Sequence, residues 1–380
     1  MSHPTHTSFD VAVVGGGVCG LVVAWRARAR GLTVVVLDRG ELGAGTSRVA
    51  AGMLAPVTEA DAGERDLLTL GLQSARRWSS FAAELEDVTG IDVGYRETGT
   101  IVVARDGDEA AALDRELALR ERLGLRATWL AASEARKLEP ALAPVLRSAL
   151  EVPGDHSVDP HALLEALVAA AGAAGVVLRP GAAVTRVLVD GGRVNGVELE
   201  GGEIVSADRT VIAAGAWSGA ELGLPPAARV PVRPVKGQIL TLRDGSGPGL
   251  LTRVLRYEHG YVVPRGDGRY IVGATQEERG FDSSVTALGI YELLRYASEL
   301  LPGLLELEVG DLAAGLRPGT PDNAPVLGAG ALEGLCWATG HHRGGILLAP
   351  VTGDLLAAEL AGEERVPAPF AAERFAGVAA

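Results

Sequence analysis

The sequence lacks the features that would place a protein across a membrane or mark it for export. Although 47% of the residues are hydrophobic, no uninterrupted apolar run reaches 18 residues, so no transmembrane span is predicted. The longest candidate run, 166–178, contains two glycines and is better interpreted as a buried helix that leads into a strand. The first ten residues, MSHPTHTSFD, lack the apolar core of a signal peptide, so no leader is expected.

Cysteines are also few, and the chain has no excess of positive charge. Two cysteines, Cys19 and Cys336, are too few for a disulfide framework or a cysteine metal site, which favours the reducing cytoplasm. No metal is expected at the histidine pair 341–342, because neighbours on a strand point to opposite faces. A net charge of −13 without a basic patch argues against a nucleic-acid partner. The arginines at 115–126 alternate with glutamates, which predicts a solvated helix face.

The sequence does contain a nucleotide-binding βαβ pattern at its start. An apolar strand, 9–14, runs into GGGVCG and a helix, and a second strand ends in Asp38. In such a motif Gly15 permits the tight turn, Gly17 lets a pyrophosphate approach the backbone, and Gly20 lets helix and strand pack closely. Phosphates then lie on the positive end of the helix dipole. Asp38 can accept a hydrogen bond from a ribose hydroxyl, so a dinucleotide site is predicted.

The remaining pattern alternates helices and strands, becomes rich in strands, and returns to a helix. Paired glycines separate the strands of a meander over 183–207. Further strands are predicted at 99–104, 175–178 and 209–214, with several more over 230–275. Helices are predicted at 65–89, 107–124, 133–139 with Ser133 as N-cap, from 159 with Asp159 as N-cap, at 285–300 and at 345–360.

A chain of 380 residues suggests two domains. The order of the elements predicts that they are interleaved. A nucleotide-binding domain is assembled from 1–85, 150–225 and 315–380, and a second domain from 86–149 and 226–314.

Six sequence blocks, in order along almost the whole chain, carry a more specific resemblance. They are VVGGGVCG (13–20), GTSRVAAGMLAP (45–56), TVIAAGAWS (210–218), PVKGQ (234–238), YVVPRGDGRYIVGATQ (261–276), and AGLRPGTPDNAPVLG with GHHRGGILLAP (314–328 and 340–350). Together they resemble the D-amino-acid oxidase family of flavoproteins and, within it, the bacterial glycine oxidases of thiamine biosynthesis. The resemblance implies an α/β fold, with a Rossmann-like FAD-binding domain interleaved with an α+β substrate domain on a mixed, largely antiparallel sheet.

The cofactor that the resemblance implies is FAD. Cys336 does not match the attachment motif of the sarcosine oxidases that bind flavin covalently, so non-covalent FAD is expected. The small residues of the 45–53 loop can bring donors close to the phosphates and the flavin, and Val184 matches a position on the adenine side. Residues 344–347, at the start of the last helix, can stabilise negative charge at the flavin N1–C2 carbonyl. The implied cofactor residues are Gly15, Gly17, Val18, Cys19, Gly20, Asp38, Arg39, Thr46, Ser47, Ala51, Gly52, Met53, Val184, His341, His342, Arg343, Gly344, Gly345, Ile346 and Leu347.

The same resemblance assigns the substrate side. Arg317 matches the arginine that binds the substrate carboxylate, for which a planar guanidinium fork has the right shape. Tyr261 matches a tyrosine that holds the substrate, and His259 is expected to face the same side of that strand. Arg343 matches an arginine near both flavin and substrate. Gln276 and His342 stand where the best-known glycine oxidase has a methionine and an aromatic residue, so the substrate range is left open.

The implied reaction needs no acid or base residue of the protein. A hydride passes from Cα of a neutral amine, such as glycine, sarcosine or D-alanine, to flavin N5. Oxygen is reduced to hydrogen peroxide, and the imine gives a 2-oxo acid and ammonia or enters thiazole synthesis. Three alternatives stay open: a flavin dehydrogenase that passes electrons to a quinone or carrier, a non-catalytic FAD-binding protein, and an NAD-linked dehydrogenase. The residues also leave open whether the chain forms a homo-oligomer.

Overall fold

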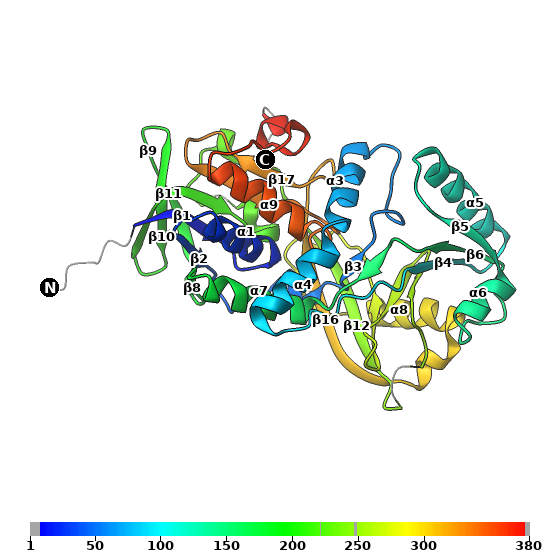
Figure 1. The fold of residues 1–380 in the computed structure, drawn as a ribbon. Coiled ribbons are helices and arrows are strands. Elements are labelled where there is room, and N and C mark those ends of the chain that lie inside the picture. Colours follow the sequence, from blue (N-terminus) through cyan, green and yellow to red (C-terminus); the bar gives the residue numbers. More distant parts are fainter. Residues whose placement is uncertain (1–7, 221, 247–248, 377–380) are drawn as a thin grey trace.

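Two eight-stranded sheets organise the protein (Figure 1), which we describe from a computed structural model over residues 8–220, 222–246 and 249–376. Two parts of segments discussed above lie outside the described residues. They are residues 1–7, in the N-terminal segment where no leader is expected, and residues 377–380, in the last predicted piece of the nucleotide-binding domain. The first sheet runs in the order β17 (Val326–Ala329), β18 (Leu335–Thr339), β11 (Ile204–Ile212), β1 (Ser8–Val14), β2 (Val34–Leu37) and β8 (Val177–Arg179). β10 (Arg193–Leu199) and β9 (Val184–Asp190) extend from β11 as the predicted meander.

The first sheet is parallel from β18 to β8, and its central strands are buried apolar runs. Such strands need cover on both faces of the sheet. One face is covered by α1 (Val18–Ala29), against which α7 (Pro160–Ala173) and α9 (Ala349–Leu360) pack. α7 begins as predicted, because the Asp159 side chain accepts a hydrogen bond from the His161 amide and Pro160 occupies the first turn.

The second sheet lies beside the first and is mostly antiparallel (Figure 1). Its order is β16 (Glu308–Gly319), β12 (Arg233–Arg243), β15 (Arg269–Gly273), β14 (Gly260–Pro264), β13 (Val254–Tyr257), β4 (Thr100–Ala104), β6 (Ser148–Val152) and β5 (Thr128–Ala131). The helices α5 (Gly107–Arg122), α6 (Ala132–Leu138) and α8 (Ala287–Leu300) belong to this half of the molecule. Three short elements lie in the sequence between strands of the first sheet and strands of the second. They are α2 (Thr46–Val49), which contacts α7 and β16, and the strands β3 (Met53–Leu54) and β7 (His156–Ser157), which pair with each other. None of the helices in the described ranges is long and apolar enough to span a membrane.

The strands are distributed over the sheets much as the interleaved domains require. The first sheet takes its strands from 8–37, 177–212 and 326–339, and the second from 100–152 and 233–319. Two strands of the second sheet, β6 and β16, cross the predicted boundaries at 150 and 315. The division into two domains stays a prediction, with these two boundaries moved to the strand ends.

Four local predictions were wrong. The helix predicted over 65–89 is broken into α3 (Arg65–Ala75) and α4 (Trp78–Thr89), and the side chains of Ser74 and Trp78, on either side of the break, both donate to the Leu347 carbonyl. Ser133 is not an N-cap, because α6 starts one residue earlier and follows Ala131. The strand predicted at 209–214 is the end of the longer β11, and the last helix starts at Ala349 rather than at 345.

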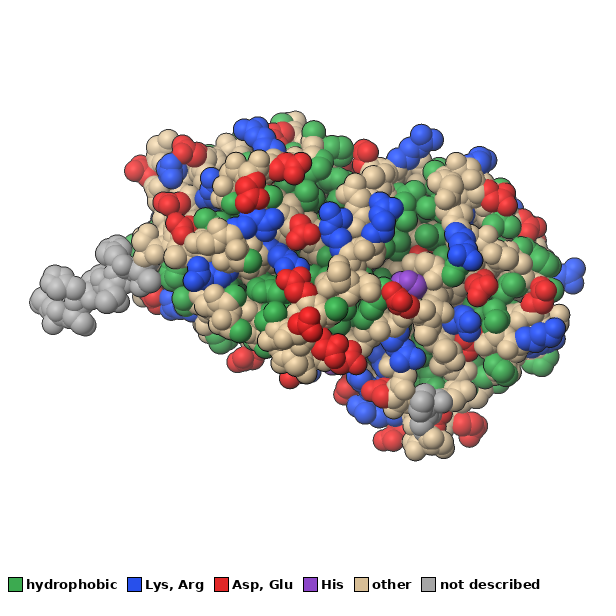
Figure 2. All heavy atoms as spheres, viewed as in Figure 1, with side chains coloured by type: hydrophobic (Ala, Val, Ile, Leu, Met, Phe, Trp, Pro, Cys, Tyr) green, Lys and Arg blue, Asp and Glu red, His purple; other side chains and the backbone are tan. Residues whose placement is uncertain are grey.

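The predicted solvated face of α5 is also wrong at one position. Arg120 is only 2% exposed, and its guanidinium donates to the carbonyls of Thr58 and Glu116. Glu116 also pairs with it at 3.2 Å. Elsewhere acidic and basic side chains are interspersed on the face that Figure 2 shows.

Candidate active site

A cavity of about 640 Å³ extends from the carboxyl ends of β1 and β2 to the strands β12, β14 and β16 of the second sheet. In parallel α/β sheets, ligands bind at this end of the strands. All the residues assigned to the cofactor from the sequence line this cavity except Gly20. Arg317, Tyr261 and Arg343 line it as well, so both groups of predicted residues meet in one space.

The glycine turn has the geometry that a bound pyrophosphate needs. Gly15 has a positive φ of 112°, and a Cβ there would come within 2.4 Å of the Ala213 carbonyl oxygen. A Cβ on Gly20 would come within 1.9 Å of the Gly15 carbonyl oxygen, so Gly20 serves the packing of helix on strand and does not face the cavity. Gly17 is the N-cap of α1 and lines the cavity with no side chain in the way.

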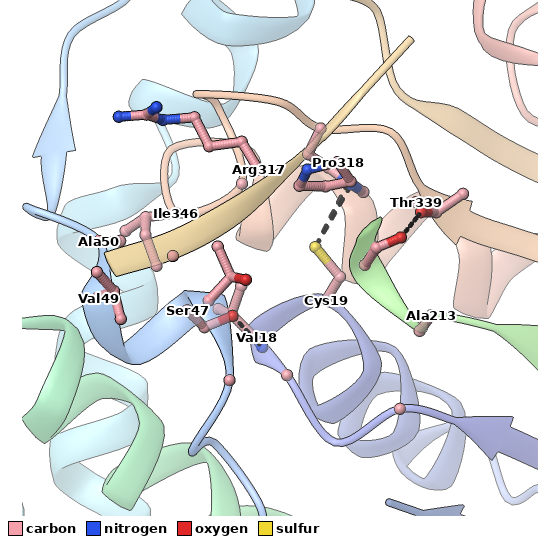
Figure 3. Close-up of a pocket in the computed structure, with 18 of the residues that line it drawn as sticks. Val18, Cys19, Ser47, Val49, Ala50, Ala213, Arg317, Pro318, Thr339 and Ile346 are labelled. Carbon is pink, nitrogen blue, oxygen red and sulfur yellow. Dashed lines mark hydrogen bonds between the residues drawn. The ribbon is translucent and has the colours of Figure 1, made fainter. Parts of the chain in front are cut away.

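Hydrogen bonds from neighbouring loops fix this turn. The Ser47 hydroxyl accepts a hydrogen bond from the Val18 amide at 3.1 Å, and Figure 3 shows this contact below the strand that carries Arg317. The Thr46 hydroxyl donates to the Leu316 carbonyl at 2.9 Å, which ties the same loop to β16. The Arg39 guanidinium lies over the Trp217 ring, 4.1 Å from its centre. Trp217 lines the cavity too and was not among the predicted residues, although its block was.

The loop before α9 closes the other side of the cavity. Within the described ranges, the amides of Gly345, Ile346 and Leu347 have no hydrogen-bond partner. These unpaired donors beside a helix start suit a group that carries negative charge. The glycines of the turn and this row of free amides, which line one cavity, fit a dinucleotide cofactor such as FAD.

Two histidines of this loop stay neutral at physiological pH. His341 is 3% exposed; its Nε2 lies 3.0 Å from the Thr352 hydroxyl, and its ring nitrogens lie 3.6 Å from the Cys19 sulfur. Burial lowers the pKa of His341 to about 4. Burial and the nearby charges of Arg343 and Arg317 lower the pKa of His342 to about 4 as well. Cys19 is neutral too, since burial raises the pKa of its thiol to about 12.

Arg317 and Tyr261 present free polar groups to the cavity. Nη1 of Arg317 donates to the carbonyls of Thr275 (3.1 Å) and Lys236 (3.4 Å). Its Nε and Nη2 make no hydrogen bond within the part of the chain that the structure describes, so they are available to a ligand carboxylate. The Tyr261 hydroxyl has no hydrogen-bond partner among these residues either, and burial raises its pKa, so it is neutral.

Two predicted substrate residues do not reach the cavity. His259 lies in the turn between β13 and β14 and not on a strand. In this turn the centre of its ring is 4.1 Å from the centre of the Tyr296 ring, and its Nε2 lies 3.5 Å from Oε2 of Glu258. Gln276 is exposed in the loop after β15. The expectation for His259 was wrong because a strand alternation was extended into a turn, where it no longer holds.

Sequence reasoning missed two charged residues of the cavity, Glu41 and Glu59. Glu59 lines it and accepts a hydrogen bond from Arg256 Nη1 at 3.1 Å. It lies three residues beyond the block 45–56, and only this proximity could have pointed to it. Among the described residues, no three His, Cys, Asp or Glu side chains are grouped so that they could hold a metal ion.

Comparison with known proteins agrees with this geometry. Residues 10–359 match the family of FAD dependent oxidoreductases called DAO. The chain is 37% identical over 375 residues to the glycine oxidase of Geobacillus kaustophilus, covering 97% of this chain and 98% of that protein. The crystal structure of glycine oxidase from Geobacillus kaustophilus superposes with a TM-score of 0.90 at 36% identity, over 97% of this chain and 99% of that one.

Two further relatives have different names. The chain is 38% identical over 351 residues to the bifunctional protein ThiO/ThiG of Trichormus variabilis, which covers 92% of this chain but 52% of that protein, so the chain spans about half of its length. It is 34% identical over 406 residues to the hydrogen cyanide synthase subunit HcnC of Pseudomonas aeruginosa, covering 97% and 96%. The chain therefore belongs to the DAO family of FAD dependent oxidoreductases, has the mixed α/β fold of that family, and uses FAD as its cofactor.

Proposed function

We propose that the chain is an FAD-dependent oxidase of glycine and of small amines or D-amino acids such as sarcosine and D-alanine. The observation that supports this proposal is the position of Arg317, which has Nε and Nη2 donors unused within the described residues and lines the same cavity as the dinucleotide loops. The similarity to glycine oxidases over the full length of both chains supports the same substrate class.

In this proposal Arg317 binds the substrate carboxylate in a bidentate manner and Tyr261 contributes its neutral hydroxyl. The two residues fix the orientation of Cα, and orientation alone accounts for several kcal/mol of a barrier. Neutral His342 adds no positive charge beside the substrate amine. FAD, when bound, supplies the acceptor for the hydride, with oxygen as the final oxidant and hydrogen peroxide as its product. The imine product hydrolyses to a 2-oxo acid and ammonia, or to a 2-oxo acid and methylamine when the substrate is sarcosine.

The similarity to ThiO/ThiG supports a second fate for the imine, which is use in thiazole synthesis. A second candidate function is a dehydrogenase of the same substrates that passes electrons to a quinone or a protein carrier. The similarity to HcnC, which is named a hydrogen cyanide synthase subunit and not an oxidase, keeps this candidate open. As part of the main proposal we place the enzyme in the cytoplasm, where its cysteines, Cys19 and Cys336, stay unpaired.

Oxygen uptake and peroxide formation with glycine, sarcosine and D-alanine test the proposal. We expect turnover with at least one of the three and peroxide in a 1:1 ratio to oxygen consumed. Reduction of the flavin by glycine under anaerobic conditions, combined with slow reoxidation by air, would favour the dehydrogenase instead. Absence of flavin reduction by all three substrates would contradict both candidates.

A further inference from the structure

The guanidinium of Arg317 is held in place by strand β12 and by the segment that follows β15. A Cβ on Gly237 of β12 would lie 2.3 to 2.5 Å from Nη1, Nη2 and Cζ of Arg317, so the guanidinium rests flat against a position that only glycine leaves open. Gly237 does not have a positive φ, so its backbone conformation alone does not demand glycine. The residue type at 237 is therefore explained by the arginine above it.

The second support is the carbonyl of Thr275, which accepts a hydrogen bond from Nη1 at 3.1 Å. The Thr275 hydroxyl accepts from the Gln238 amide at 3.0 Å and donates to the Glu277 carboxylate at 2.6 Å. Gln238 is fully buried, and its side-chain amide donates to the same carboxylate at 2.7 Å. These bonds fix the segment after β15 against β12.

Gly237 lies against the whole guanidinium, whereas the hydrogen bonds to the part of the chain that the structure describes engage only Nη1 and leave Nε and Nη2 free. Nη1 donates to the carbonyls of Thr275 and Lys236. A rigid guanidinium loses less entropy when it binds a carboxylate, so this arrangement favours binding. Loss of either support lets the fork rotate away from the substrate.

We propose that Gly237 and Thr275 are positioning residues that orient Arg317 for the carboxylate of the substrate. They act through Arg317, against which Gly237 lies and to whose Nη1 the Thr275 carbonyl is hydrogen-bonded. This inference deepens the proposed function and rests on the carboxylate-binding role given to Arg317 there. The consequence is that changes at 237 and 275 weaken the binding of carboxylates and leave the binding of FAD intact.

The test measures the dissociation constant of acetate by titration calorimetry and the KM and kcat for glycine. We expect Gly237→Ala to weaken acetate binding and raise KM about 10- to 100-fold, the effect of losing good geometry at a charged hydrogen bond. Thr275→Val removes the hydroxyl at nearly constant volume. It is expected to raise the dissociation constant of acetate and the KM for glycine about 10-fold each. Thr275→Ser keeps the hydroxyl and is expected to remain within about 2-fold of the wild type.

Matched variants separate positioning from a general structural role. Gly310→Ala adds the same methyl group to the neighbouring strand β16. Thr89→Val, at the end of α4, removes a hydroxyl that also accepts from a backbone amide and donates to a second acceptor, here the Leu85 carbonyl. Both are expected to leave acetate binding unchanged. In an Arg317→Ala background, Gly237→Ala and Thr275→Val should have no further effect on flavin reduction by glycine, because the residue through which they act is gone.

The inference is overturned if Gly237→Ala or Thr275→Val leaves acetate binding unchanged, or if either has its full effect in the Arg317→Ala background. Failure of the carboxylate-binding role given to Arg317 in the proposed function has a different result, because Arg317→Ala alone would then leave acetate binding unchanged. Since acetate binding needs no turnover, the test also applies to a protein that does not oxidise glycine.

Discussion

The carboxylate of Asp38 accepts a hydrogen bond of 2.7 Å from the amide of Gly16, which ties the end of β2 to the glycine turn after β1. Its other oxygen accepts from the Gly40 amide at 2.8 Å, and the residue still lines the cavity. Carboxylate oxygens have spare lone pairs, so Asp38 can keep these bonds and accept from a ribose hydroxyl at the same time. We therefore expect Asp38 to act both by holding the glycine turn and by binding the ribose.

Asp38→Ala is expected to weaken FAD binding at least 10-fold, since a hydrogen bond to a charged group contributes about 1.5–3 kcal/mol. Asp38→Asn keeps one acceptor oxygen and should therefore weaken FAD binding less than Asp38→Ala does. Titration of the apoprotein with FAD measures both. The control is Asp92→Ala, which removes a similar contact to the Gly94 amide away from the cavity. Equal FAD affinity for Asp38→Ala and Asp92→Ala would contradict the role of Asp38.

FAD should leave the protein when it is denatured with acid. Neither cysteine is placed to hold the flavin covalently, because Cys336 is buried in β18 outside the cavity and Cys19 lies at the start of α1 with a neutral thiol. The flavin absorbance is expected in the supernatant after precipitation and centrifugation. Flavin that stays with the pellet would show that the attachment is covalent.

The sequence predicted the parts of the site that are local. The glycine turn, Asp38 and the loop residues 45–53 each occur within a short stretch of sequence, and residues from each of them line the cavity. The division of 65–89 into two helices was not predictable, because the Leu347 carbonyl that receives Ser74 and Trp78 is about 270 residues away in sequence. The hydrophobic periodicity of a helical segment carries no information about contacts with residues so far away in the sequence.

Arg120 and His259 illustrate the same limit in opposite directions. Arg120 repeats the charge pattern of an exposed helix, yet it is buried because the Thr58 carbonyl lies above it. His259 was placed in the cavity by its spacing from Tyr261, yet β14 begins only at Gly260. One residue of error at a strand end therefore moved a side chain out of the site.

The buried His341 should make stability depend on pH. Its pKa in the folded protein is about 4, below the value near 6.5 of an unfolded chain, so acid favours the unfolded state. The free energy of unfolding that depends on neutral His341 is fully present above pH 6.5. It is lost as pH falls towards 4, by about 3 kcal/mol in total. Urea unfolding at pH 7.5 and 4.5, with FAD saturating, measures it.

His341→Gln removes the titrating ring and keeps polar groups for Thr352. The free energy of unfolding of this variant should fall by about 2–3 kcal/mol less than that of the wild type between the two pH values. His259→Gln, at the surface, is the control variant. If the wild type and His341→Gln lost the same free energy, the proposed cause of the acid sensitivity would be wrong.

Arg317→Lys separates the geometry of the carboxylate site from its charge. Lysine keeps the positive charge but has no planar fork, and it cannot bind the Thr275 carbonyl and a carboxylate with the same rigid group. Loss of a hydrogen-bonded charge partner at a desolvated site costs about 2–5 kcal/mol, which corresponds to roughly 30- to 5000-fold in kcat/KM.

Arg317→Ala should lower kcat/KM further, since the carboxylate would then enter the cavity without a partner. FAD content should be normal in both variants, because the cofactor loops take no support from this side chain. Steady-state oxidation of glycine and the ratio of flavin to protein absorbance measure the two quantities. If Arg317→Ala oxidised glycine with near wild-type efficiency, the carboxylate would have to bind elsewhere. Arg343, which also lines the cavity, would be the next residue to replace.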